Sequence, residues 1–197
     1  MAWRVAQSLL TLLAEVNALY PERYKGTDGS ISGYTYGAGG VVVNPYNQSS
    51  HNINSEGVVC AFDITTGDYA GGISVAAGQA LAEQIRIRVR DQPRGIPFYG
   101  IHYMAPPYVA IAGPKICTYG TNWEWEHYSG SDLHKSHQHW SADWDVFPGG
   151  APSGLADYDS TLPWNLTSLA GQGSGVTPTP TYTADQQFLV DLGLALT

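Results

Sequence analysis

Residues 133–140 read LHKSHQHW and place three of the six histidines in the chain at the spacing HxxHxH. In a β-strand every second side chain lies on the same face. We therefore expect His137 and His139 to share one face of a strand that continues to about residue 142. His134 lies just outside this alternation, and we expect its side chain to lean over the same site.

A second polar cluster begins at His51 and ends at Asp63, within an apolar run (VVCAFDI, residues 58–64) that is typical of a buried strand. If this strand neighbours the one with the histidines, Asp63 can face His139 across the sheet, while His51 arrives from a loop. Two neutral imidazoles and a carboxylate, with a fourth position open to water, are a ligand set typical of catalytic zinc. These residues therefore predict a zinc-dependent hydrolase.

Composition and charge narrow the function classes further. The chain has 197 residues, of which 43% are hydrophobic and 13% charged, and its net charge of −8 comes from 9 basic and 17 acidic side chains. Nucleic-acid binding depends on lysines and arginines that neutralise phosphates, and the sequence has no basic stripe. No apolar run approaches the ~18 residues of a membrane span, and the N-terminal apolar residues lack an export-signal pattern. We therefore expect no nucleic-acid partner and no membrane span.

The spacing of apolar residues predicts an α+β fold. Steps of three and four residues favour helices over residues 3–20 and 74–91, the second with Ser74 as N-cap, and a long loop is expected over 25–50. Further short strands are expected over residues 98–104, 108–112 and 115–119. A strand, a helix and then several strands joined by short turns favour an antiparallel sheet flanked by helices.

The composition changes after the last predicted strand. We expect the zinc domain to occupy residues 1–147. Residues 148–183 are rich in Gly, Pro and Thr, which is typical of a linker. Residues 184–197 are expected to form a short C-terminal helix or the start of a truncated module.

The sequence also resembles a known peptidase family. The segment from Ser49 to Asp63 is similar to the SxHxxGxAxD motif of the zinc D-Ala-D-Ala and L,D-carboxypeptidases, which share the hedgehog/DD-peptidase fold, and HxxHxH resembles their second motif. In particular, the chain resembles the peptidase domains of phage endolysins. Many of these open with MAWRVA, continue with an Asp-Gly turn (Asp28-Gly29 here) and read HNPxSxGxVxAxDIT where this chain reads HNINSEGVVCAFDIT. The resemblance covers roughly residues 1–143.

This resemblance implies a role for each matching residue. His51, Asp63 and His139 match the zinc ligands of the family. His137 matches the first histidine of HxH, placed to act on the bound water or to hold the transition state, and His134 matches a further histidine near the substrate. Zinc would lower the pKa of its bound water to about 7 and polarise the scissile carbonyl. His137 or His134 would then stabilise the developing oxyanion.

Several other residues have two interpretations. Trp123, Trp125 and Tyr128 could bind substrate by lining a groove for a sugar-peptide strand, or they could cover the edge of the sheet. His134 could close the zinc site as a fourth protein ligand, which would make the zinc structural. The histidine cluster could also lie on the surface without any metal.

The remaining reactive side chains are expected to be structural. Cys60 and Cys117 lie in apolar runs, which favours buried free thiols, with a single disulfide as the alternative. His102 is expected within a strand and His127 on an exposed aromatic loop.

Two functions from different classes are consistent with this sequence. In the first, the protein is a zinc metallopeptidase that hydrolyses an amide bond in bacterial peptidoglycan, in stem peptides or in cross-links. Such an endolysin would be a monomer that waits in the host cytoplasm until it is released to the cell wall. In the second, the protein is a non-catalytic, zinc-containing module of the same fold that binds the wall or has a structural role.

Overall fold

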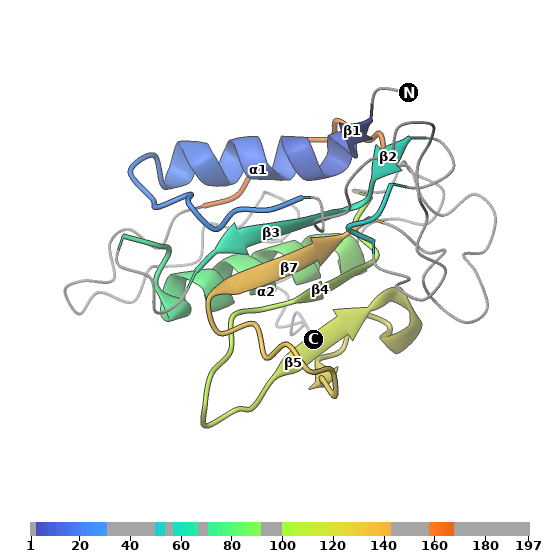
Figure 1. Ribbon diagram of the computed structural model, residues 1–197. Coiled ribbons are helices and arrows are strands. Elements are labelled where there is room, and N and C mark those ends of the chain that lie inside the picture. Colours follow the sequence, from blue (N-terminus) through green and yellow to red (C-terminus); the bar gives the residue numbers. More distant parts are fainter. Residues whose placement is uncertain are drawn as a thin grey trace, which may run out of the picture.

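In the part of the chain that the structure describes, the fold is organised around a five-stranded antiparallel sheet (Figure 1). The computed structural model describes residues 3–30, 50–53, 57–66, 71–91, 100–142 and 158–167. Within these residues the strand order is β3-β7-β4-β5-β6, and every neighbouring pair is antiparallel. The strands are β3 (Ala61–Thr65), β4 (Tyr103–Ala105), β5 (Lys115–Thr118), β6 (Glu126–His127) and β7 (His137–Ser141).

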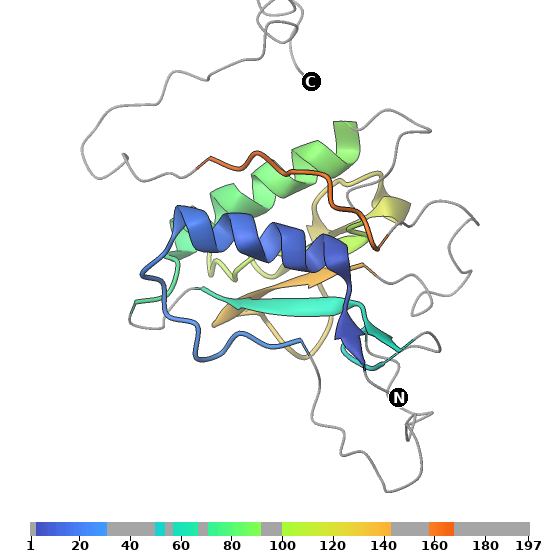
Figure 2. The same ribbon diagram turned by 90° about the horizontal axis from the view of Figure 1, so that it is seen from above.

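The described residues also form two helices, α1 (Gln7–Leu19) and α2 (Val75–Asp91), and a short 3-10 turn, η1 (Tyr119–Thr121). In Figure 1 α1 lies above β3 and α2 lies behind β7, and Figure 2 shows both helices on the same side of β3 and β7. The predicted α+β class with an antiparallel sheet is therefore confirmed. Among the described residues, neither helix has the length and apolar character needed to cross a lipid bilayer.

The register between β3 and β7 determines which side chains face the helices. Asp63 lies opposite His139, and Thr65 lies opposite His137. Because side chains alternate between the two faces of a strand, His137 and His139 share one face, as predicted. Trp140 points to the other face, where it is fully buried against the helices. The sheet therefore has a helix face and a site face.

The hydrophobic core fills the space between the helices and the sheet. Each helix contributes apolar residues at steps of three and four, which places them on one side of the helix. A fully buried aliphatic side chain of this kind contributes about 1.5–3 kcal/mol to stability. The principal members are Leu9, Leu12 and Val16 of α1, Leu81, Ile85 and Val89 of α2, and Phe62, Ile64, Met104 and Trp140 of the sheet.

The first helix begins later than its periodicity predicts. A helix is expected from residue 3, but α1 begins at Gln7 because Arg4 and Val5 form β1. This short strand pairs in parallel with β2 (Val58–Val59). Since the partner strand lies far along the chain, no local pattern near the N-terminus could indicate the pairing.

The second helix matches its prediction. A helix is expected over residues 74–91 with Ser74 as N-cap, and α2 spans Val75–Asp91. The backbone N–H of Ala77 donates to the Oγ of Ser74 at 3.2 Å. This bond satisfies one of the N–H groups that the first turn of a helix leaves without an intrahelical partner.

The single strand expected over residues 58–64 is divided at Cys60. The backbone N–H of Cys60 donates to the carbonyl of Ser50 at 3.1 Å, and its own carbonyl accepts from the N–H of Ala142 at 2.7 Å. The chain therefore changes partners at this residue, from β1 on one side to β7 on the other. The bond to Ser50 also fixes the backbone directly before His51.

The run over residues 108–112 forms a turn, so the prediction of a strand there is wrong. The backbone N–H of Gly113 donates to the carbonyl of Val109 at 2.8 Å, which closes the turn. Pro107 and Pro114 lie on either side and have no N–H to contribute to a sheet.

Both cysteines are buried free thiols, as the sequence favours. Cys60 and Cys117 each belong to the hydrophobic core. Burial raises the pKa of the Cys117 thiol, which keeps it protonated at neutral pH.

Part of the predicted linker belongs to the folded domain. Residues 158–167, drawn in orange, run along the two helices in Figure 2. The backbone N–H groups of Trp164 and Leu166 donate to the carboxylate of Glu15 on α1 at 2.5 and 3.1 Å, and both side chains join the core. Although residues 148–183 are rich in Gly and Pro, Trp164 and Leu166 within them bind this segment to the hydrophobic core. The helix or module expected over residues 184–197 lies outside the described residues.

We predict that Trp164→Ala lowers the free energy of unfolding by about 3–5 kcal/mol, because it leaves a cavity between the helices. Trp3→Ala is a matched control, since Trp3 is 39% exposed, and it should cost about 1 kcal/mol or less. Chemical denaturation monitored by circular dichroism measures both values. Equal losses in the two variants would show that residues 158–167 do not pack on the domain.

Candidate metal centre

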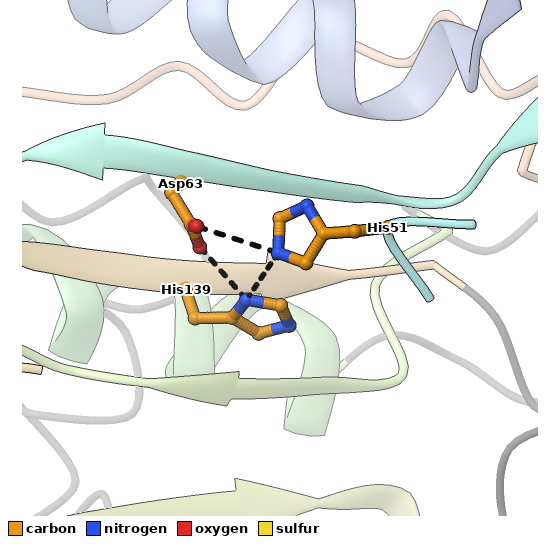
Figure 3. A group of neighbouring side chains, drawn as sticks. All are labelled: His51, Asp63 and His139. Atoms are coloured by element: carbon orange, nitrogen blue, oxygen red, sulfur yellow. Dashed lines mark hydrogen bonds and ion pairs between the residues drawn. The ribbon is translucent and has the colours of Figure 1, made fainter. Parts of the chain in front are cut away.

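Three side chains from distant segments meet on the site face of the sheet (Figure 3). His51 comes from the loop before β2, Asp63 from β3 and His139 from β7. The Nδ1 of His139 lies 2.8 Å from Oδ1 of Asp63 and 3.2 Å from Nε2 of His51. The Nε2 of His51 lies 3.4 Å from Oδ2 of Asp63. The predicted meeting of Asp63 with His139 and His51 is confirmed.

These distances fit the coordination shell of a metal ion. A tetrahedral ion with bonds of about 2.1 Å holds its ligand atoms about 3.4 Å apart. The two imidazole nitrogens here lie 3.2 Å apart, and each lies 2.8 or 3.4 Å from one of the two carboxylate oxygens of Asp63, so small outward movements would accommodate an ion between the three side chains. Two imidazole nitrogens and one carboxylate oxygen could therefore hold a metal ion at this position.

The protonation states of Asp63 and His139 also suit metal binding. Burial favours a higher pKa for Asp63, but the hydrogen bonds from His139 and His51 outweigh it and hold the pKa well below its ordinary value. Burial lowers the pKa of His139, despite its hydrogen bond to Asp63. Near neutral pH the site therefore has an ionised carboxylate and a neutral imidazole, which are the forms that bind metals.

His51 differs from His139 in its affinity for a proton. Burial by itself lowers the pKa of His51, but the hydrogen bond and the negative charge of Asp63 raise it above the ordinary value. A proton and a metal ion therefore compete for the Nε2 of His51.

Two neighbours orient the histidine ligands. The backbone carbonyl of Ser30 accepts a hydrogen bond from Nδ1 of His51 at 2.9 Å, which leaves Nε2 directed at Asp63 and His139. The ring of Tyr103 stacks on His139, with centroids 4.8 Å apart and planes inclined by 24°. Such outer partners fix the tautomer and the orientation of a ligand. No sequence pattern could indicate Ser30, because it acts through its backbone.

The other two histidines of HxxHxH border the same site. The Nε2 of His137 lies 3.8 Å from Oδ1 of Asp63 and 3.7 Å from Oδ2 of Asp132. The ring of His134 lies 5.1 Å from that of His137 and 6.1 Å from that of His139, measured between centroids. His134 therefore leans over the site, as the sequence predicts.

The backbone of His134 has a left-handed conformation that non-glycine residues seldom adopt, with φ of 53°. Its N–H donates to Oδ1 of Asp132 at 3.0 Å, and its carbonyl accepts from the N–H of Tyr108 at 2.9 Å. Burial lowers the pKa of the His134 imidazole to about 4. The side chain is therefore neutral at neutral pH and can donate a hydrogen bond without adding a positive charge.

The predicted aromatic group divides between the two faces of the sheet. The ring of Tyr128 lies 4.9 Å from that of His134, so this residue borders the site. Trp123 belongs to the core, and the indole N–H of Trp125 donates to Glu83 on α2 at 2.9 Å. The two tryptophans therefore anchor the chain after η1 to the helix face, which favours the alternative interpretation that they cover the sheet, and their role in substrate binding stays a prediction.

The remaining two histidines lie apart from the three ligands. His102 is buried before β4, and burial lowers its pKa to about 3. His127 is exposed on β6. The sequence-based interpretation of both as ordinary structural residues agrees with these positions.

Comparisons with known proteins assign no family to this chain. No protein-family model matches the sequence, and no curated protein or solved structure matches it. The likeness to zinc carboxypeptidases therefore depends on the motifs and on the geometry of the site.

We predict that Asp63→Asn weakens binding of a divalent metal ion, with zinc as the probe, by at least about 100-fold, because the amide replaces the only anionic side chain of the three. Asp91→Asn removes the same charge from an exposed position of α2 and should leave the affinity unchanged. Competition with a chromophoric chelator measures both constants. Similar affinities in Asp63→Asn and the parent protein would exclude this site.

We also predict that the zinc affinity falls as the pH is lowered from about 8 to about 6. Because the pKa of His51 is raised, this side chain takes up a proton at a higher pH than an ordinary histidine does, and the proton must leave before the metal binds. Calorimetric titrations at several pH values, in buffers of different ionisation enthalpy, measure the affinity and the protons released. A pH-independent affinity would contradict the assignment of His51 as a ligand.

Proposed function

We propose that this protein is a zinc-dependent peptidoglycan peptidase, an endolysin that hydrolyses an amide bond in bacterial stem peptides or cross-links. The observation that carries the proposal is the meeting of His51, Asp63 and His139 beside the first histidine of HxH. The two motifs that resemble the zinc carboxypeptidases therefore lie together in space, in the arrangement that their chemistry requires.

Zinc is the metal that best suits this donor set. Imidazole nitrogens and a single carboxylate are typical ligands of catalytic zinc, which keeps one further position for water or substrate. When bound, zinc would supply a water of lowered pKa and polarise the scissile carbonyl. His51, Asp63 and His139 would hold the ion.

His137 is the best candidate for moving a proton in this reaction. It projects from β7 on the same face as His139, and its Nε2 lies within 4 Å of Asp63, at 3.8 Å from Oδ1. A histidine next to the metal position can accept a proton from the attacking water or donate one to the leaving amine. Oδ2 of Asp132 lies 3.7 Å from the same Nε2.

His134 is suited to stabilising the oxyanion. Its pKa of about 4 keeps the ring neutral, so it can donate one N–H to an oxygen that gains negative charge. Tyr128 packs against His134 and would limit its movement while contacting the substrate. Left-handed backbone in a non-glycine residue is often found at functional sites, where the surrounding structure maintains it.

The proposal also includes the route to the substrate. A phage endolysin accumulates in the host cytoplasm and reaches peptidoglycan after the membrane has been opened. With a net charge of −8 the chain gains no attraction to an anionic wall. Recognition would therefore depend on contacts near the site with the sugar-peptide strand.

We predict that the protein clears suspensions of purified cell walls, that a chelator abolishes clearing and that added zinc restores it. His137→Ala should reduce the rate by about 100-fold or more while zinc affinity is retained, because proton transfer contributes about that factor. His127→Ala is the matched control, since His127 is exposed on β6. Turbidity and mass spectrometry of the released peptides give the rate and the bond cleaved.

Clearing that survives both the chelator and His137→Ala would reject the zinc-peptidase proposal. Zinc binding and sedimentation with walls, without release of peptides, would indicate the non-catalytic module instead.

A further inference from the structure

The segment that links α1 to the metal centre contains a buried ion pair. Residues 23–30, called the edge segment below, run between α1 and the outer edge of β3 as a blue trace in Figure 1. The guanidinium of Arg23 donates to both carboxylate oxygens of Asp28, at 2.8 and 2.5 Å. The Arg23 side chain is only 1% exposed. Its Nε also donates to Oδ1 of Asn17 on α1 at 2.9 Å.

Asp28 joins this pair to β3. Its Oδ1 accepts from the backbone N–H of Thr65 at 3.0 Å and from the Thr65 hydroxyl at 2.9 Å. Thr65 is two residues after Asp63 on the same strand and is fully buried. The ion pair therefore connects α1, the edge segment and the strand that supplies the carboxylate ligand.

The two residues after Asp28 reach the metal ligands directly. Gly29 exchanges both backbone hydrogen bonds with Asp63, with N···O distances of 3.1 and 2.6 Å. Ser30 then presents its carbonyl to Nδ1 of His51 at 2.9 Å. An N–H on Nδ1 leaves the lone pair on Nε2, which is the nitrogen that faces Asp63 and His139.

A buried ion pair is a weak source of stability, because desolvation of both charges offsets their attraction. The two parallel hydrogen bonds between Arg23 and Asp28 do, however, restrict the conformation of the backbone that joins these residues. We propose that the Arg23–Asp28 ion pair is a positioning device, which holds the Ser30 carbonyl against His51 and so aims His51 Nε2 at the metal. The inference rests on the metal centre of the proposed function, and it does not depend on which bond that enzyme cleaves.

The first test compares Asp28→Asn with Asp159→Asn. Asparagine keeps the Oδ1 that accepts from Thr65 and loses the charge that pairs with Arg23. Asp159 forms an exposed ion pair with Arg4, so its variant controls for the charge change. Loss of an outer partner typically weakens metal binding about 10- to 100-fold. We expect that reduction in zinc affinity for Asp28→Asn and an unchanged affinity for Asp159→Asn.

A second readout separates positioning from general stability. Heteronuclear NMR of the imidazole nitrogens in the metal-free protein, at a pH above the pKa of His51, reports which nitrogen of the neutral ring carries the proton. We expect Nδ1 in the parent and in Asp159→Asn, and a mixture of both tautomers in Asp28→Asn. A purely structural role would lower stability and leave the tautomer of the folded protein unchanged.

A double variant covers the case in which Asp28→Asn does not fold. Arg23→Met with Asp28→Asn removes both charges together, which is often neutral or stabilising for a buried pair, and keeps the Oδ1 that accepts from Thr65. We expect a folded protein with the same loss of zinc affinity. Parent-like zinc affinity or a parent-like His51 tautomer in either folded variant would overturn the inference. Failure of both variants to fold would overturn it as well, because the pair would then be structural.

These outcomes are distinct from failure of the proposed function. A parent protein that binds zinc but releases no peptides would remove the peptidase proposal and leave the positioning role intact. A parent protein without zinc affinity would overturn both.

Discussion

In the ladder between β3 and β7, Asp63 stands directly opposite His139, and the same register directs Trp140 into the core. Because side chains alternate with a period of two, a slip of one residue would turn the histidines toward the helices and expose the tryptophan. Burial of Trp140 therefore maintains the register that brings carboxylate and imidazole together. The hydrophobic core and the candidate metal centre therefore lie on opposite faces of the same pair of strands, β3 and β7.

At the pairing of β3 with β7, three buried or partly buried polar side chains lie next to one another, and a bound cation would stabilise this arrangement. His51 Nε2 and His139 Nδ1 face each other at 3.2 Å beside the carboxylate of Asp63. Burial opposes the ionised form of each of these groups. Partly desolvated polar atoms are costly unless they have partners. A divalent ion would satisfy all three ligand atoms at once, whereas a proton can be shared by only two of them.

The outer parts of the fold serve this centre through backbone atoms as much as through side chains. Ser50 accepts from Cys60 and fixes the chain before His51, while Ser30 accepts from His51 itself. Residues 158–167 run along the two helices, and Trp164 and Leu166 pack into the core. Since any residue type can supply a carbonyl, such contacts leave no pattern in the sequence. For the same reason the sequence predicts a helix from residue 3, whereas α1 begins at Gln7.

The sequence by itself determined the features that depend on neighbours in the chain. Strand alternation placed His137 and His139 on one face, Ser74 indicated the start of α2, and ligand chemistry selected Asp63 as their partner. Tertiary structure decided which face Trp123 and Trp125 occupy, and it supplied the edge segment. These depend on pairing between distant segments, where the free energy comes from burial and from register. The local periodicity of apolar residues does not indicate which distant segments pair or in which register they pair.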